Sequence, residues 1–85
     1  MQDMDLPIKL QINSPRQTLV DCQVENVTLP GICGLFEVLK DHAPLITALE
    51  PGTIRYKGPR GEKTLEVRSG FVMVLQNEVN VCVEQ

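Results

Sequence analysis

The sequence that decides the fold lies between Val27 and Gly52 and reads VTLPGICGLFEVLKDHAPLITALEPG. Its apolar residues come in short runs, and a Pro-Gly pair stands near each end, at Pro30-Gly31 and Pro51-Gly52. Proline cannot donate a backbone hydrogen bond to a sheet and glycine tolerates tight turns, so both pairs predict turns between strands. His42, the one histidine of the chain, interrupts the apolar runs. We therefore expect a β segment that serves as a docking element and not as an active site.

The rest of the chain repeats this short-strand pattern. Ile8, Leu10 and Ile12 alternate with polar residues, which is the period of a strand with one face in a core and one in water. The same alternation recurs at the C-terminal end, between Val79 and Val83. No stretch shows a sustained helical period with caps. Strands at a spacing of about 8–12 residues predict an all-β fold, a small β-sandwich or flattened barrel of about ten short, mostly antiparallel strands.

Two segments depart from simple alternation. The apolar positions shift by one between Val24 and Val27, which predicts a bulge or bend near Glu25-Asn26, where a strand changes sheets. The run from Phe71 to Leu75 is apolar at every position. Such a strand is either covered on both faces or meets a partner with its outer face. The residues alone leave both alternatives open.

Length and composition restrict the function classes. At 85 residues, the chain is expected to form a single β-sandwich domain over residues 6–85, with a flexible N-terminus at residues 1–5. A net charge of −3 and 4% aromatic residues argue against nucleic-acid binding, which depends on clustered positive charge and stacking side chains. The basic residues alternate with apolar residues and glutamates, as on a solvated sheet face. They are Arg55, Lys57, Arg60, Lys63 and Arg68.

Few residues of the chain are of a type that carries chemistry. Cys22, Cys33, Cys82 and His42 could supply metal ligands, but they lack the close pairing that structural zinc sites usually show. We expect no metal and no cofactor. Adjacent residues on a strand point to opposite faces, so Asp41 and His42 do not form a catalytic dyad. A small enzyme that uses His42 remains an alternative, but no catalytic residue is expected.

Three segments in order resemble a known family. They read VENVTLPG at 24–31, HAPLITALEPG at 42–52 and SGFVMV at 69–74. All three are similar to the N-terminal β-sandwich of the epsilon subunit of bacterial F-type ATP synthase, which corresponds to the mitochondrial delta subunit. The similarity covers residues 6–84, which is nearly the whole chain.

The resemblance implies a non-catalytic central-stalk subunit, part of the rotor. In the family this domain links the gamma shaft to the membrane c-ring during rotary, proton- or sodium-driven ATP synthesis. A peripheral position on the cytoplasmic face of a bacterial inner or plasma membrane is implied, with the membrane reached only through the complex. The gamma-side positions carry over to His42, Pro44, Leu45 and Thr47. The c-ring-side loop carries over to Gly31, Ile32, Cys33, Gly34 and Leu35.

This sequence departs from the family pattern at three places. Leu35 stands where the family often has an acidic residue, and Lys40-Asp41 stands where Pro-Gly is common. The family usually continues into a C-terminal helical hairpin, whereas this chain ends at Gln85 and resembles either a naturally short form or a piece that ends at the domain boundary. We therefore expect neither nucleotide binding nor inhibition by helices. The alternative function is a free-standing β-sandwich that binds a ligand or a protein, and a deep apolar pocket would indicate the ligand-binding form.

Overall fold

The computed structural model describes residues 6–85, and within them it contains nine β-strands and no helix. The expected flexible N-terminus at residues 1–5 lies outside the described residues. The strands are β1 (Ile8–Asn13), β2 (Thr18–Val24), β3 (Asn26–Gly31), β4 (Gly34–Val38), β5 (Leu45–Leu49), β6 (Gly52–Gly58), β7 (Gly61–Val67), β8 (Ser69–Leu75) and β9 (Glu78–Glu84). The all-β prediction is confirmed. Residues 6–85 hold no helical segment with the length and hydropathy that a membrane crossing requires.

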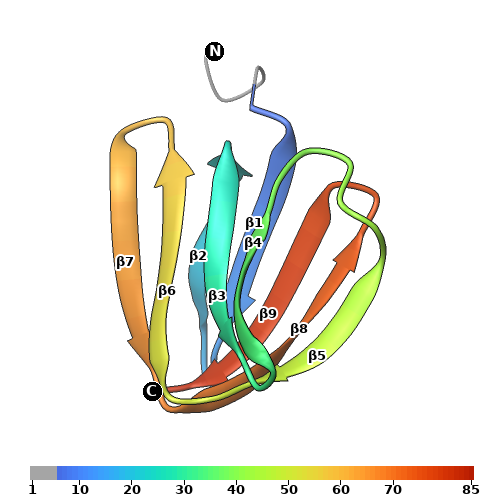
Figure 1. Ribbon diagram of the computed structural model, residues 1–85. Helices are drawn as coiled ribbons and strands as arrows, with labels where there is room; N and C mark the ends of the chain where they lie inside the picture. Colours follow the sequence, from blue (N-terminus) through green and yellow to red (C-terminus); the bar gives the residue numbers. More distant parts are fainter. Residues whose placement is uncertain (1–5) are drawn as a thin grey trace.

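The strands form one sheet that folds back on itself (Figure 1). The strand order is β2-β1-β9-β8-β5-β3-β6-β7, and β4 pairs with β3 outside this path. The fold gives two layers, β2-β1-β9-β8-β5 and β4-β3-β6-β7. Every pairing is antiparallel except that of β1 with β9, which is parallel. The prediction of a sandwich or flattened barrel with mostly antiparallel strands is confirmed.

Three short connections carry the chain from one layer to the other. Glu50-Pro51 separates β5 from β6, and the single residue Arg68 separates β7 from β8. Glu25 alone separates β2 from β3, and its backbone N–H donates to the carbonyl oxygen of Lys57 at 2.7 Å. The predicted bend near Glu25-Asn26 is confirmed, and it falls at Glu25. A one-residue change of direction lets the apolar positions on both sides of Glu25 face the same core.

The first predicted turn falls later than expected. Pro30 and Gly31 are the last two residues of β3, and the turn consists of Ile32 and Cys33. The Pro30 carbonyl accepts a hydrogen bond from the Glu50 N–H (3.0 Å), on the side where the β5–β6 connection interrupts the ladder. The nitrogen of a strand residue points to the same side as its carbonyl, so the missing donor of Pro30 breaks no ladder bond.

The core lies between the two layers and consists of aliphatic side chains. Ile8, Leu10 and Ile12 are completely buried, as the alternation predicts. Val79, Val81 and Val83 are buried on the neighbouring strand. No polar or charged side chain is buried among residues 6–85. The remaining buried core residues are Val24, Val27, Leu29, Val38, Leu49, Ile54, Val67, Val72 and Val74.

Candidate functional site

Strand β8 has one buried face and one exposed face, and both are apolar. It lies between β5 and β9 and pairs with each along its length. Val72 and Val74 are buried, whereas Phe71, Met73 and Leu75 are 55%, 44% and 52% exposed. Of the two alternatives for this run, a strand covered on both faces is therefore wrong for the described part of the chain. The outer face of β8 is open.

The register of β5 extends this exposed surface. Ile46 lies opposite Met73, and Ala48 lies opposite Phe71. Ile46 is 73% exposed, and Ala48 is also exposed. We refer to the outward side chains of these two strands as the apolar face. Its residues are Ile46, Ala48, Phe71, Met73 and Leu75.

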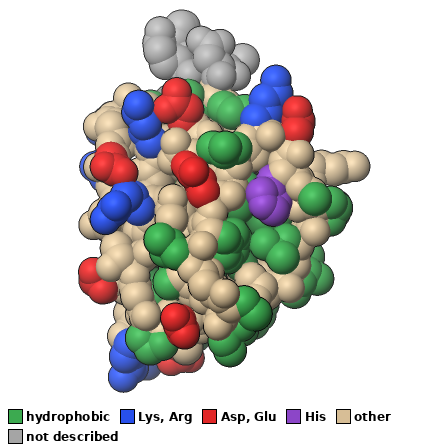
Figure 2. Space-filling model, in the orientation of Figure 1, with side chains coloured by type: hydrophobic (Ala, Val, Ile, Leu, Met, Phe, Trp, Pro, Cys, Tyr) green, Lys and Arg blue, Asp and Glu red, His purple; other side chains and the backbone are tan. Residues whose placement is uncertain are grey.

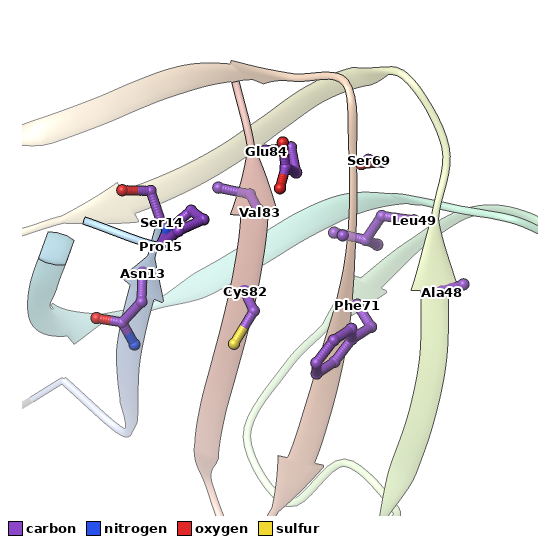
Figure 3. A pocket seen from close by; sticks show the side chains of 11 residues that line it. Asn13, Ser14, Pro15, Ala48, Leu49, Ser69, Phe71, Cys82, Val83 and Glu84 are labelled. Atoms are coloured by element: carbon purple, nitrogen blue, oxygen red, sulfur yellow. The ribbon is translucent and has the colours of Figure 1, made fainter. Parts of the chain in front are cut away.

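The apolar face has a polar boundary at β9. Asn80 lies opposite Met73, and Glu78 lies opposite Leu75. At the other end a single row crosses four strands, from Asn13 through Cys82 and Phe71 to Ala48. Figure 3 shows this end of the face, where an open depression of about 550 Å³ runs between β1 and β5. The surface is broad and shallow there.

The outer face of the other layer has the opposite character. Arg55 and Lys57 project from β6 into water and lie 3.8 Å and 3.3 Å from the carboxylates of Glu62 and Glu25. Exposed ion pairs of this kind contribute little to stability. Figure 2 shows charged side chains over β6 and β7 and hydrophobic side chains on the side of β5 and β8. The predicted solvated face is confirmed, because all five basic residues of that prediction are exposed.

The predicted c-ring-side loop is a tight turn that projects from the end of the β3–β4 hairpin. Gly31 pairs with Gly34, and the Ile32 N–H donates to the Ala48 carbonyl at 2.9 Å. Ile32 is 60% exposed and Leu35 is 73% exposed. The turn is thus attached to β5 by its backbone, while its apolar side chains point into water.

The predicted gamma-side residues lie on β5 and on the loop before it. Leu45 and Thr47 are half-buried and pair with Val74 and Val72 of β8. Pro44 is exposed. The ring nitrogen Nδ1 of half-buried His42 lies 2.7 Å from the Ala43 carbonyl oxygen, to which it donates. His42 therefore bonds within its own loop.

The two predicted sets lie around one groove. β4 and β5 diverge from the turn at Ile32-Cys33, and the loop 39–44 joins them at the other end (Figure 1). The open groove between them has a volume of about 370 Å³. It is lined by Gly31, Cys33, Gly34, Leu35, Phe36, His42, Leu45, Ile46 and Thr47. Ile32 and Pro44 do not line it.

Sequence reasoning missed two features of this surface. Ile46 was not singled out, although Leu45 and Ile46 are adjacent on a strand and one of them has to face outward. The second feature is a pair of hydrogen bonds between Asp41 and Asn77. No local pattern signals it, because the two residues stand 36 positions apart.

The candidate chemical groups are not brought together. Cys22 lies on β2, Cys33 in the turn after β3 and Cys82 on β9. No group of three or more His, Cys, Asp or Glu side chains among residues 6–85 is placed to hold a metal ion. Away from the apolar face, burial raises the pKa of Tyr56 above its ordinary value of 10.0, and the negative charge of Cys22 raises it further. The Tyr56 hydroxyl is therefore neutral at pH 7.

Comparisons with known proteins agree with this geometry. The family model described as "ATP synthase, Delta/Epsilon chain, beta-sandwich domain" matches residues 7–85. The ATP synthase epsilon chain of Chlorobaculum tepidum is 35% identical over 86 residues, which cover 100% of this chain and 98% of that protein. The epsilon chain of Chlorobium limicola is 33% identical, with 99% and 97% covered.

A solved structure has the same fold. A chain in the mitochondrial ATP synthase of Euglena gracilis, described as OSCP/F1/c-ring, superimposes with a TM-score of 0.86. The match covers 93% of this chain and 51% of that chain, at 20% sequence identity. At this identity, the likeness shows the fold alone. The matched region of the family model includes the apolar face and both walls of the groove.

Proposed function

Since this chain belongs to the family of ATP synthase delta and epsilon chains, we propose that it links the gamma shaft to the c-ring of an F-type ATP synthase. The resemblance of the three sequence segments is confirmed. As an epsilon-type chain, it is a non-catalytic, accessory subunit of a membrane-associated complex. We further propose that it acts in the rotor during proton- or sodium-driven ATP synthesis, peripherally, on the cytoplasmic face of a bacterial membrane.

The apolar face is the observation that carries this proposal. Phe71, Met73, Leu75 and Ile46 are large side chains, each at least 44% exposed, and they adjoin one another across two paired strands. Contiguous exposed apolar surface on a small domain indicates a protein interface, since water solvates it poorly. The depressions along this face are open, and none is the deep pocket that the ligand-binding alternative requires.

Two neighbouring regions suggest how the partners divide. We propose that gamma covers the apolar face together with His42, Pro44, Leu45 and Thr47. The c-ring would then meet the projecting turn at residues 31–35. Ile32 and Leu35 are exposed and apolar there, so the contact with the ring would be a packing contact without the acidic residue that is common in the family. Gamma and the c-ring would then contact neighbouring regions of the same hydrogen-bonded sheet.

A binding experiment with a matched control tests the gamma side. Met73→Glu places a charge at the centre of the apolar face, whereas Thr64→Glu places the same charge on the exposed outer face of β7, opposite Arg55. Purified gamma is titrated with each variant. We expect Met73→Glu to weaken binding by at least about 1.4 kcal/mol, which is tenfold, because a buried unpaired charge is costly. Thr64→Glu should bind like the wild type.

The result that would contradict the proposal is equal gamma affinity for Met73→Glu and Thr64→Glu. Both side chains are exposed in the free chain, so both variants should fold, and thermal unfolding checks this. Ile32→Glu tests the ring side separately, with detergent-solubilised c-ring and the same control, because Ile32 is exposed and does not line the groove. We expect ring binding to be strongly weakened and gamma binding to be retained.

A further inference from the structure

A pair of hydrogen bonds attaches the loop 39–44 to the turn between β8 and β9. The backbone N–H of Asp41 donates to Oδ1 of Asn77 at 2.6 Å. Nδ2 of Asn77 donates in return to Oδ1 of Asp41 at 3.1 Å. The hydrogen bond from the His42 N–H to the Leu39 carbonyl (3.2 Å) stays within the loop. The carboxamide of Asn77 therefore connects the loop to a second element.

Asn77 itself is held firmly. It forms a two-residue turn with Gln76, between the paired residues Leu75 and Glu78. Its carbonyl oxygen accepts a hydrogen bond from the Lys9 N–H at 2.9 Å, which ties the turn to β1. Gln76 and Asn77 have φ angles of 49° and 62°. Such turns favour glycine at the second position, and a glycine there would lack the side chain that contacts the loop.

The loop end of the contact is also in an uncommon conformation. Asp41 has a φ of 64°, in the left-handed region that asparagine, aspartate and glycine tolerate best. The conformation turns the Asp41 N–H and carboxylate toward the same carboxamide. Two left-handed residues from separate elements thus meet through two reciprocal hydrogen bonds, and the direction of the loop is set by this contact.

The loop contributes residues to the proposed gamma-binding surface and to the groove beside it. Pro44 lines an open depression of about 390 Å³ together with Ile46, Met73 and Leu75 of the apolar face. His42, on the same loop, lines the groove between β4 and β5. Asp41 directly precedes His42 in this loop and lies three residues before Pro44, so the position of Asp41 limits where both residues can lie.

We infer that Asn77 is a positioning residue for partner binding: its carboxamide holds the loop 39–44 so that His42 and Pro44 complete the surface that receives gamma. This inference rests on the proposed function. Ordering a loop at the moment of binding reduces affinity, whereas a loop that is ordered beforehand avoids that cost. Asn77 thus acts on binding through Asp41, without itself belonging to the apolar face.

Asn77→Gly removes the carboxamide and keeps the backbone conformation of the turn. Two readouts are measured: hydrogen exchange of the Asp41 amide by NMR in the free protein, and the affinity for purified gamma. We expect the Asp41 amide to exchange at least about tenfold faster and gamma to bind about five- to tenfold more weakly, as the loss of two exposed hydrogen bonds predicts. Gln76→Gly, in the same turn, should change neither.

A rescue experiment separates positioning from general damage. In the double variant Asp41→Asn with Asn77→Asp, the carboxylate at position 77 accepts from the backbone N–H and the side-chain amide at position 41. The hydrogen bond from the backbone N–H thereby keeps its direction, and the bond between the two side chains is restored with donor and acceptor exchanged. In the double variant, we expect the backbone amide at position 41 to exchange hydrogen as slowly as in the wild type. Most of the gamma affinity should return as well. The single variant Asn77→Asp, which cannot donate to the Asp41 carboxylate, should not recover them.

Two outcomes would overturn the inference. One is an Asp41 amide that exchanges equally slowly in Asn77→Gly and the wild type. The other is faster exchange with unchanged gamma affinity, which would mean that the loop order has no role in binding. Failure of the proposed function looks different, because gamma would then bind Met73→Glu as tightly as the wild type, whatever the state of the loop.

Discussion

Replacing Gly70 with alanine tests whether the fold depends on a close approach of β8 to its paired strand β9. Gly70 follows the Arg68 connection by two residues and lies opposite Val83. A Cβ atom at this position would overlap the Cys82 carbonyl oxygen and lie 3.0 Å from the Val83 Cα atom. These are backbone atoms of a paired strand, so no side-chain rotation relieves the overlap. β8 and β9 have to separate at this end.

The expected magnitude is large for a single methyl group. Overpacking usually costs about 1–3 kcal/mol, and we expect about 3 kcal/mol here because the obstacle is backbone. A domain of this size has a total stability of about 4–13 kcal/mol. Each kcal/mol lowers the melting temperature by about 4–8 °C, so the midpoint should fall by about 12–24 °C.

Gly58→Ala is the matched control. Its added methyl group would meet its nearest neighbours at 3.7–3.9 Å, which is ordinary contact. We expect a change within about 1 kcal/mol, because the loss of unfolded-chain entropy favours alanine at a compatible site. Thermal and urea unfolding, followed by circular dichroism, give both values. A Gly70→Ala variant that loses no more stability than Gly58→Ala would refute the argument from close approach.

Four further changes test separate parts of the structure. Val81→Ala empties a completely buried position and should lower the free energy of unfolding by about 1–3 kcal/mol in urea titrations, whereas an unchanged midpoint would place Val81 outside the core. Gln76→Gly should raise the free energy of unfolding by about 0.5–1 kcal/mol, because φ is 49° at this position and glycine adopts positive φ without strain. A lower free energy of unfolding would contradict this turn conformation. For Tyr56, the folded-state pKa is raised by burial and then by Cys22, so its contribution to stability is complete below pH 10 and lost as pH rises through that pKa. Urea unfolding from pH 7 to 11 should therefore show a smaller alkaline loss in Tyr56→Phe, and parallel curves would contradict this. His42→Ala should weaken gamma binding and leave the melting temperature nearly unchanged, since the side chain is half-buried and bonds within its loop; unchanged binding would exclude His42 from the interface.

The strands could be predicted from the sequence because the burial of one face of a strand determines which of its residues are apolar. Residues such as Leu10 and Val81 face the core, and their polar neighbours face water. Apolar and polar residues therefore alternate along the sequence of each strand. The same logic identified Phe71 to Leu75 as exceptional. The alternation could not show whether this strand is covered on both faces or meets a partner with its outer face. Both arrangements require the same continuous apolar run.

The pairing of distant strands could not be predicted in this way. β1 and β9 pair in parallel, with Leu10 opposite Val79, although the two residues are far apart in the chain. Ladder hydrogen bonds are made by the backbone and are nearly independent of the side chains, so the local pattern does not name the neighbour. The contact of Asp41 with Asn77 was missed for the same reason. The family resemblance supplied candidate positions, but not the groove that brings them together.

The placement of the apolar face suits a part that transmits force. β8 is hydrogen-bonded to β5 on one side and to β9 on the other, and it passes through Arg68 directly into β7 of the second layer. A push on Met73 would therefore spread to both neighbouring strands and to the opposite layer, instead of bending one edge strand. A similar apolar face on β7 would lack this support, because β7 pairs with β6 alone within the described sheet. A contact with gamma at the proposed place therefore lies on a strand that is supported by a paired neighbour on each side.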